Sequence, residues 1–170
     1  MADASSRPPR NARSTTTKFV VARDDPGRAD VLSLLVEHLA DMHATSSPES
    51  AHALDPAALT HPSITLWSAR DETGALLGVG ALKQHDAQLG EIKSMRTTAA
   101  ARGRGIASAM LATVIAECAA RGIRELALET SAEPSFAAAH SLYRRHGFIP
   151  CGPFADYSDD PNSLYLTRAV

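Results

Sequence analysis

The sequence predicts a fold of the α/β (α+β) class, in which a mixed central β-sheet is flanked by helices. Three observations support this prediction. Short β-branched segments are interspersed with long amphipathic ones; three short segments, residues 64–70, 75–83 and 90–97, follow one another directly; and residues 124–129 lie between two predicted helices. Consecutive strands favour antiparallel pairing, whereas a strand reached through a helix can pair in parallel. The expected sheet therefore contains both kinds of pairing.

The N-terminal part of the fold is expected to contain one strand and two helices. Residues 18–23 (KFVVAR) are β-branched and end at an Asp-Asp-Pro-Gly turn, which indicates a strand. Residues 28–43 place apolar side chains at helical spacing and indicate an amphipathic helix. Residues 54–59 are expected to form a short second helix, with Asp55 as its N-cap and Pro56 at its first helical position.

The central part is expected to contain the three consecutive strands and then the clearest helix of the chain. The first two strands are joined by an Asp-Glu-Thr-Gly turn and form a hairpin, to which residues 90–97 (GEIKSMRT) add a third strand. Residues 103–121 carry an apolar stripe at helical spacing. Gly122 is placed to end that helix, because glycine readily adopts the left-handed conformation that closes helices.

The C-terminal part is expected to complete the sheet. Residues 124–129 (RELALE) are expected to pair in parallel, because a helix lies on each side of them. Residues 136–146 form the next predicted helix, which Gly147 closes. Residues 148–149 and 164–167 are then expected to be antiparallel strands separated by a long proline-containing loop.

Length and composition indicate one domain and restrict its partners. The chain of 170 residues is 44% hydrophobic and 21% charged, which is ordinary for a globular domain. Residues 1–17 are rich in Ser, Thr, Pro and Arg and are expected to be a disordered tail, so that the domain spans residues 18–170. A net charge of −2 argues against nucleic acid and membrane surfaces as partners. Two cysteines, no secretory signal and no apolar membrane-spanning run favour a cytoplasmic location.

A glycine-rich turn lies between the third strand and the clearest helix. It reads Arg102-Gly103-Arg104-Gly105, and the helix follows directly. The first turn of a helix exposes unpaired N–H groups, and glycines let a phosphate approach this backbone closely. Arginines would add charge-assisted contacts. The turn is neither a Walker A loop, since no Gly-Lys-Ser/Thr follows, nor a full Rossmann fingerprint, since the third glycine is missing.

The residues that follow make the interpretation more specific. The pairing of R-G-x-G-I-A with a later A-x-x-L-Y-x-x-x-G-F, at residues 139–148, resembles the GNAT superfamily of acyl-CoA-dependent N-acetyltransferases. The resemblance covers about residues 18–168, and three further segments, SPESAHALD, GEIKSMRT and CGPFADY, are similar to a subgroup of small bacterial members. It implies acetyl-CoA as co-substrate and a fold in which the strand before the turn separates from the next parallel strand to admit it.

The resemblance also implies roles for individual residues. The strand end Met95, Arg96 and Thr97 should pair through its main chain with the pantetheine arm, and Tyr143 matches a tyrosine that protonates the departing thiolate. An ordinary core tyrosine is the alternative for Tyr143. Ala100 and Phe136 depart from the family pattern, which puts the detailed cofactor geometry in doubt. The diphosphate should be held by the backbone of Arg102, Gly103, Arg104, Gly105, Ile106 and Ala107, with the Ser108 hydroxyl.

The acceptor of the acetyl group is expected to be the primary amine of a small molecule. Glu91 resembles the glutamate that serves as general base in part of the superfamily, and Glu129 is a second candidate. Strand alternation places Glu91, Lys93, Met95 and Thr97 on one face. Lys93 would then pair with Glu91 or bind a substrate carboxylate. The alternative for Glu91 is a carboxylate fixed by hydrogen bonds, and the alternative for Lys93 is a solvated lysine. With Lys83 and Arg96, Lys93 suggests an acidic or amino-acid acceptor.

Histidines cluster in the region that walls the substrate cleft in GNAT proteins. His52 is a candidate substrate contact, with a loop-capping role as the alternative. No metal is expected, because the spacing fits no zinc template and His38 and His43 are too far apart on one helix. The full set is His38, His43, His52 and His61.

Two other functions remain open at this point. A non-catalytic acyl-CoA-binding sensor or regulatory module would share the cofactor site but lack turnover. A nucleotide-binding protein would use the glycine turn for ATP and depend on magnesium, although no Walker lysine is present. The predicted edge strands and the long C-terminal loop would also support a homodimer.

Overall fold

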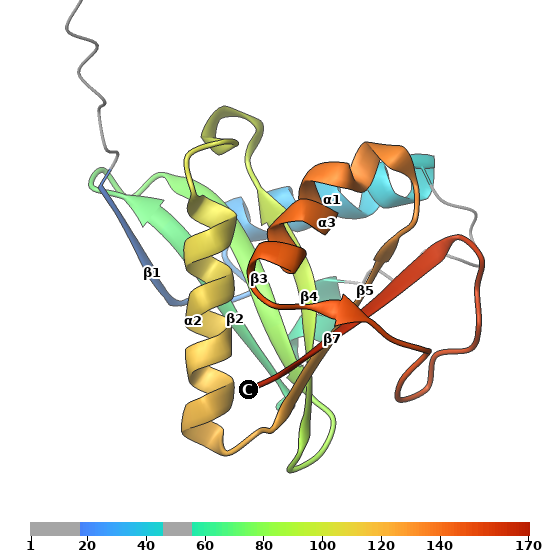
Figure 1. The fold of residues 1–170 in the computed structure, drawn as a ribbon. Helices are drawn as coiled ribbons and strands as arrows, with labels where there is room; N and C mark the ends of the chain where they lie inside the picture. The colour runs from blue at the N-terminus through green and yellow to red at the C-terminus, as the bar shows by residue number, and fades with distance from the viewer. Residues whose placement is uncertain (1–17, 46–55) are drawn as a thin grey trace, which may run out of the picture.

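The computed structural model describes residues 18–45 and 56–170 (Figure 1). The predicted tail 1–17, the predicted N-cap Asp55 and the candidate substrate residue His52 lie outside this range. The described chain forms a seven-stranded sheet with the order β1-β2-β3-β4-β5-β7-β6. The predicted mixed sheet flanked by helices is therefore confirmed.

The first half of the described chain builds the antiparallel part of the sheet. β1, β2, β3 and β4 pair in sequence order, each antiparallel to the one before. The predicted short helix before β2 is a 3-10 helix in its described part. The elements are β1 (Phe19–Arg23), α1 (Ala29–Thr45), η2 (Pro56–Thr60), β2 (Ile64–Asp71), β3 (Leu76–Gln84) and β4 (Leu89–Thr97).

The second half adds two helices and three strands. α2 begins at Ile106 and not at Gly103 as predicted, because Gly103 and Gly105 have φ values of 73° and 80°, which a right-handed helix cannot include. Gly122 ends α2 in the left-handed conformation, as predicted. The elements are η3 (Ala99–Ala101), α2 (Ile106–Arg121), β5 (Glu125–Ser131), η4 (Pro134–Phe136), α3 (Ala137–Arg145), β6 (Ile149–Pro150) and β7 (Ser163–Ala169).

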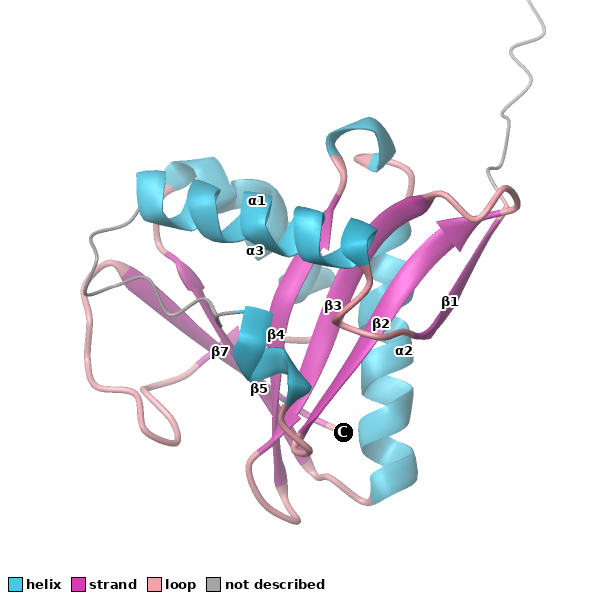
Figure 2. Cartoon of the chain, turned by 180° about the vertical axis from the view of Figure 1, so that it is seen from behind, coloured by secondary structure: helices cyan, strands magenta, loops and turns pink. Residues whose placement is uncertain are grey.

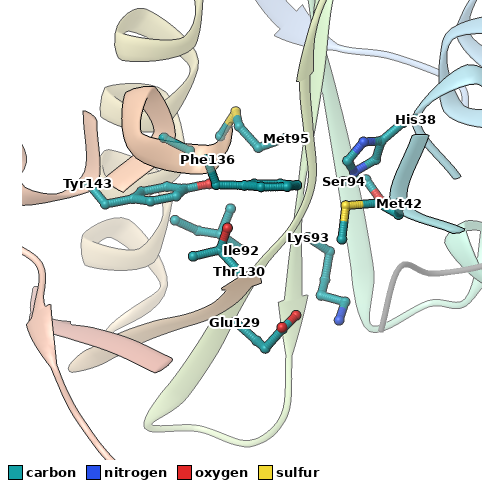
Figure 3. Close-up of a pocket in the computed structure, with 11 residues that line it drawn as sticks. His38, Met42, Ile92, Lys93, Ser94, Met95, Glu129, Thr130, Phe136 and Tyr143 are labelled. Carbon is teal, nitrogen blue, oxygen red and sulfur yellow. The ribbon is translucent and has the colours of Figure 1, made fainter. Parts of the chain in front are cut away.

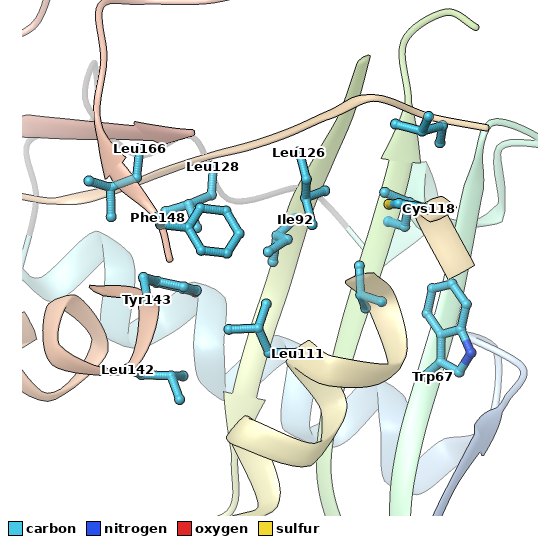
Figure 4. Close-up of a cluster of buried hydrophobic side chains, with 13 residues drawn as sticks. Trp67, Ile92, Leu111, Cys118, Leu126, Leu128, Leu142, Tyr143, Phe148 and Leu166 are labelled. Atoms are coloured by element: carbon cyan, nitrogen blue, oxygen red, sulfur yellow. The ribbon is translucent and has the colours of Figure 1, made fainter. Parts of the chain in front are cut away.

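Helices cover both faces of the sheet. Figure 2 shows α1 lying across the strands on one face, with α2 behind them. On the α1 face, Val31, Leu34 and Leu35 pack against side chains of β2 and β3. On the other face, α2 and α3 share a larger apolar cluster with β4, β5 and β7 (Figure 4). Among residues 18–45 and 56–170, no helix is long and apolar enough to cross a membrane.

The N-terminal half of α2 lies close to the sheet because β3 presents glycines to it. A Cβ atom at Gly78 would come within 3.2 Å of Ile106, and one at Gly80 within 3.0 Å of Met110. A Cβ at Gly78 would also come within 2.9 Å of the backbone carbonyl of Arg96 on β4, so a larger residue there would force the backbone to shift. The two glycines thereby let side chains of α2 pack directly on the backbone of β3.

The parallel pair β4–β5 opens partway along its length. Its register runs from Leu89↔Glu125 to Glu91↔Ala127 and goes no further. This confirms the expected parallel strand and the expected separation of the two strands. Their diverging ends leave room for side chains and ligands where an ordinary sheet would be closed by hydrogen bonds.

A β-bulge in β4 corrects the predicted alternation. Val79 pairs with Arg96 but Ala81 pairs with Lys93, so β4 contains one extra residue, and Ser94 has a φ of 52°. An extra residue reverses the direction of the side chains that follow it. Met95 therefore leaves the face of Glu91 and Lys93 and packs on the α2 side, whereas Arg96 reaches α1.

Candidate active site

A pocket lies where β4 and β5 separate, and side chains from four parts of the fold line it (Figure 3). It encloses about 90 Å³, which is small beside the several hundred Å³ of drug-sized ligand sites. Its position follows from the end of the β4–β5 ladder at Glu91 and Ala127. It is lined by His38 and Met42 from α1, Ile92, Lys93, Ser94 and Met95 from β4, Glu129 and Thr130 from β5, and Phe136, Ala139 and Tyr143 from η4 and α3.

Tyr143 projects from α3 into this pocket. Its side chain is 6% exposed, and its ring packs edge-on against Phe148 at a centroid distance of 5.7 Å. Burial, together with the negative charge of Glu129, raises the pKa of the Tyr143 phenol well above its ordinary value. The phenol therefore carries its proton at neutral pH and is a proton donor on the pocket wall.

The glycine turn before α2 fits a diphosphate group. Gly105 is the N-cap of α2 and has a left-handed backbone. It forms no side-chain hydrogen bond to the N–H groups that begin the helix. A Cβ at Gly103 or Gly105 would meet open space, so the backbone is accessible from outside. Arg102 and Arg104 are exposed beside it. Unpaired N–H groups, the positive end of the helix dipole and two guanidinium groups together suit an anion such as the diphosphate of an acyl-CoA.

Ser108 was predicted to contact the same phosphates, and the structure gives its hydroxyl a different partner. Its Oγ lies 2.7 Å from Nε2 of His146, which caps the C-terminal end of α3. Burial lowers the pKa of His146, and Arg145 and Arg168 lower it further. The bond joins the start of α2 to the end of α3. His146 was not predicted as a site residue, because its position in the family motif accepts any residue.

Glu91 lies inside the fold and does not line the pocket. It is 1% exposed, and its two carboxylate oxygens accept hydrogen bonds from Tyr157 at 2.6 Å and from His85 at 2.8 Å. Lys93 Nζ lies 3.1 Å from the same carboxylate and donates to the Tyr157 hydroxyl at 2.7 Å. Burial alone would raise the pKa of Glu91, but Lys93 and these hydrogen bonds outweigh it and lower the pKa. Glu91 is thus a buried, charged carboxylate, and Lys93, which pairs with it, lines the pocket.

The loop between β6 and β7 supplies the aromatic wall around Glu91. Tyr157 packs against Phe154 at 5.0 Å and against Tyr165 at 5.6 Å, and His85 meets Phe154 edge-on at 6.5 Å. His85 and Tyr157 were not predicted as site residues. The available signal was the segment CGPFADY, which contains Phe154 and Tyr157 and was noted only as a family resemblance.

Two of the three predicted substrate residues line the pocket, namely Lys93 and Glu129. Glu129 accepts a hydrogen bond from the Ser163 hydroxyl at 2.6 Å. Arg96, which was expected to add positive charge, instead pairs with Glu37 at 2.8 Å and with Asp41 on α1. Of the three cationic residues that suggested an acidic acceptor, Lys83, Lys93 and Arg96, only Lys93 is among the described residues that line the pocket.

His38 occupies the α1 side of the pocket, as expected for the cleft wall. Its Nδ1 is buried and has no hydrogen-bond partner in the described part of the chain. His61 lies elsewhere, with its Nδ1 2.8 Å from Ser63 Oγ. Within residues 18–45 and 56–170, no group of His, Cys, Asp and Glu side chains is arranged to hold a metal ion.

The fold and the site together define a class of protein. A helix N-terminus that fits a diphosphate, next to a pocket between diverging parallel strands with a buried tyrosine, suits an enzyme that transfers an acyl group from acyl-CoA. The model of the acetyltransferase (GNAT) family matches residues 31–148. The chain belongs to this family and is an acetyl-CoA-dependent acyltransferase.

Individual relatives agree with this assignment. The uncharacterized N-acetyltransferase YsnE of Bacillus subtilis is 48% identical over 86% of this chain and 97% of its own. The uncharacterized N-acetyltransferase YedL of Escherichia coli is 42% identical over 89% of this chain and 95% of its own. An IAA acetyltransferase of Azospirillum brasilense is 34% identical over 88% of this chain and 97% of its own.

Solved structures share the fold at lower sequence identity. A GNAT-family acetyltransferase from Staphylococcus aureus superposes with a TM-score of 0.71 at 16% identity, over 89% of this chain and 99% of its own. A GNAT-family acetyltransferase from Elizabethkingia anophelis with acetyl-CoA bound superposes with a TM-score of 0.62 at 17% identity, over 89% of this chain and 98% of its own.

Proposed function

We propose that this enzyme transfers an acetyl group from acetyl-CoA to a primary amine of a small molecule by direct attack. One observation carries the proposal: the pocket at the opening of β4 and β5 contains Tyr143, and the diphosphate-fitting turn lies at the end of the same β4. The small volume of the pocket favours a compact acceptor.

Backbone groups would bind and orient the acetyl donor. N–H groups from Arg102 to Ala107 are suited to hold the diphosphate, as the open turn before α2 suggests. The ladder between β4 and β5 ends at Glu91 and Ala127, so that main-chain groups near Met95 and Thr97 on this edge of β4 can pair with an amide-containing arm. When bound, acetyl-CoA supplies the activated thioester.

Proton movements in this scheme depend on side chains. Tyr143 is positioned to give its proton to the sulfur as the carbon–sulfur bond breaks, because its phenol is neutral and lines the pocket. Glu91 was predicted to take the proton of the amine. Its burial and its three partners mean that such a role requires Lys93 or a water molecule as an intermediate.

The candidate acceptors follow from the relatives and from the charges on the pocket wall. One relative is named for IAA, and this compound belongs in a first substrate panel. Lys93 and Glu129 on the pocket wall support including amino acids, whose opposite charges could meet them. The panel should also contain polyamines and simple alkylamines, so that charge preference becomes measurable.

The test is thiol release from acetyl-CoA over this panel, with the parent enzyme and the Tyr143→Phe variant. We expect turnover with at least one amine and a kcat lowered by about 10²- to 10⁴-fold in Tyr143→Phe, with unchanged affinity for acetyl-CoA. Tyr165→Phe is the matched control, because Tyr165 is a buried tyrosine that does not line the pocket. A parent protein that binds acetyl-CoA but turns over no amine would instead support the sensor function.

A further inference from the structure

A hydrogen-bonded pair, Ser108 and His146, joins the first turn of α2 to the C-terminal end of α3. Ser108 is the third residue of α2, and its Oγ lies 2.7 Å from Nε2 of His146. Side chains in a helix point back toward its N-terminus, so this hydroxyl is directed toward the helix end where the diphosphate is proposed to bind. Both residues are partly exposed, so the pair is open to a ligand that binds at the turn.

The number of protons on His146 decides what the Ser108 hydroxyl can do. A hydroxyl has one hydrogen to donate and two positions at which it can accept. A neutral imidazole can accept that hydrogen at Nε2, whereas a protonated imidazole carries a hydrogen on each nitrogen and can only donate. When His146 is protonated, the Ser108 oxygen accepts from the ring, and its own hydrogen is available for a phosphate oxygen. The same proton adds a positive charge beside the turn.

The surroundings of His146 disfavour this proton as long as no anion is bound. Burial lowers the pKa of the ring, and the charges of Arg145 on α3 and Arg168 on β7 lower it further. Arg168 is fixed near the ring, since it donates to the backbone carbonyl of His146 at 2.6 Å. On the α2 side the ring meets the uncharged hydroxyl of Ser108. A diphosphate carries negative charges, which favour a protonated imidazole and thereby oppose the effect of both arginines.

We propose that His146 is a positioning residue for acyl-CoA: it takes up a proton from solvent when the diphosphate binds and thereby directs the Ser108 hydroxyl toward a phosphate oxygen. This rests on the proposed function, because the turn at Gly103 and Gly105 has to hold the diphosphate. The hydrogen bond between the two side chains is kept, with Nε2–H of His146 donating to Oγ of Ser108. Binding of the cofactor then becomes stronger as the pH falls, because proton uptake on binding couples the two equilibria.

Calorimetry with 3′-dephospho-coenzyme A between pH 5.5 and 8 tests the proposal. This probe keeps the diphosphate but lacks the phosphate monoester of coenzyme A, whose own pKa of about 6 would add a second pH dependence. Each titration is run in two buffers of different ionisation enthalpy, which gives the number of protons taken up on binding. The same titrations with acetyl-CoA give the difference between parent and variant, in which the contribution of the monoester cancels.

Three variants are compared with the parent protein, after thermal unfolding has shown that each is folded. His146→Gln keeps a hydrogen-bonding group near the place of Nε2 but cannot be protonated in this pH range. Ser108→Ala removes the hydroxyl and leaves the imidazole. His140→Gln is the matched control, because His140 lies on the same helix and donates from Nε2 to the backbone carbonyl of Ser131 at 2.8 Å, away from this pair.

We expect the parent and His140→Gln to take up a fraction of a proton on binding and to bind about 3- to 10-fold more tightly at pH 6 than at pH 8. His146→Gln should bind like the parent at pH 8, without proton uptake and without tighter binding at pH 6. Ser108→Ala should bind about tenfold more weakly than the parent at pH 6, because a hydrogen bond to a charged phosphate is lost. A purely structural role of His146 would lower the thermal stability of His146→Gln but would not remove proton uptake.

Two results would overturn the assignment of His146. The first is equal proton uptake in the parent and in His146→Gln, because the proton would then enter another group. The second is a parent protein with the same affinity at pH 6 and at pH 8. Either leaves the proposed function intact, because the cofactor still binds. A parent protein that binds neither the probe nor acetyl-CoA would refute the proposed function itself.

Discussion

Replacing Lys93 with methionine would leave the buried Glu91 carboxylate without the cation that lies 3.1 Å away. The remaining hydrogen bonds from Tyr157 and His85 satisfy its oxygens but do not replace the positive charge of Lys93. Breaking a buried ion pair by removing one partner costs about 3–5 kcal/mol. For a domain of this size that corresponds to a fall in Tm of roughly 6–20 °C.

The stability lost in Lys93→Met should depend on pH. The direction of this dependence follows from the pKa of Glu91. Burial raises that pKa, and in the parent Lys93 and the hydrogen bonds outweigh this, so that the folded pKa lies below the ordinary value of 4.5. The charged network therefore stabilises the parent above about pH 4.5 and is lost as the pH falls through the lower folded pKa. In Lys93→Met the pKa of Glu91 rises, so the carboxyl is protonated more easily. The difference between the two proteins should be largest near pH 7 and shrink toward pH 4.5.

Urea unfolding of both proteins between pH 4.5 and 7.5 measures this difference. Lys18→Met serves as control, because Lys18 is 80% exposed and its pairing with Glu72 at 3.8 Å should contribute less than about 0.5 kcal/mol. The double variant Lys93→Met with Glu91→Gln should recover most of the loss, since no charge remains buried. A deficit below 1 kcal/mol at pH 7, or one that does not change with pH, would refute the reasoning.

Three further predictions concern the turn, the core and the cysteines. Gly105→Ala, at a φ of 80°, should cost about 1–2 kcal/mol and weaken acetyl-CoA binding in calorimetry; an unchanged Kd would show that the turn does not hold the cofactor. Leu126→Ala, in the fully buried cluster of Figure 4, should lower the free energy of unfolding by about 2–5 kcal/mol in urea, whereas Val20→Ala, 69% exposed, should change it by less than about 0.5 kcal/mol. Cys118 is buried and its pKa is raised to about 11, so it should react with a disulfide reagent far more slowly in the folded protein than in urea; equal rates would contradict its burial.

Much of the fold could be predicted because its elements are encoded locally. The apolar stripe of α2 and the β-branched strands follow from spacings of two to four residues along the chain. The parallel pairing of β5 followed from the helices on either side of it. The start of α2 was missed by three residues, because the left-handed glycines Gly103 and Gly105 both belong to the turn and delay the helix.

Prediction was less successful where the site depends on contacts between distant segments. Glu91 was expected at the pocket, but Tyr157, more than sixty residues later in the chain, closes over it. The bulge at Ser94 was not visible in the alternating pattern of GEIKSMRT, since a bulge is defined by the partner strand as well as by its own residues. That bulge turns Arg96 toward α1, where Glu37 and Asp41 pair with its charge.

Four features could be predicted without the structure: the class of fold, the glycine turn before α2, the acyl-CoA-dependent family and the place of Tyr143 near the end of α3. These depend on short motifs whose geometry is set within a few residues. Three others became visible in the folded chain: the point where β4 and β5 separate, the carboxylate that is buried and the histidine that faces the pocket. Those features arise from packing between elements far apart in the chain, where burial and pairing of charges, and not local spacing, determine the position of each side chain.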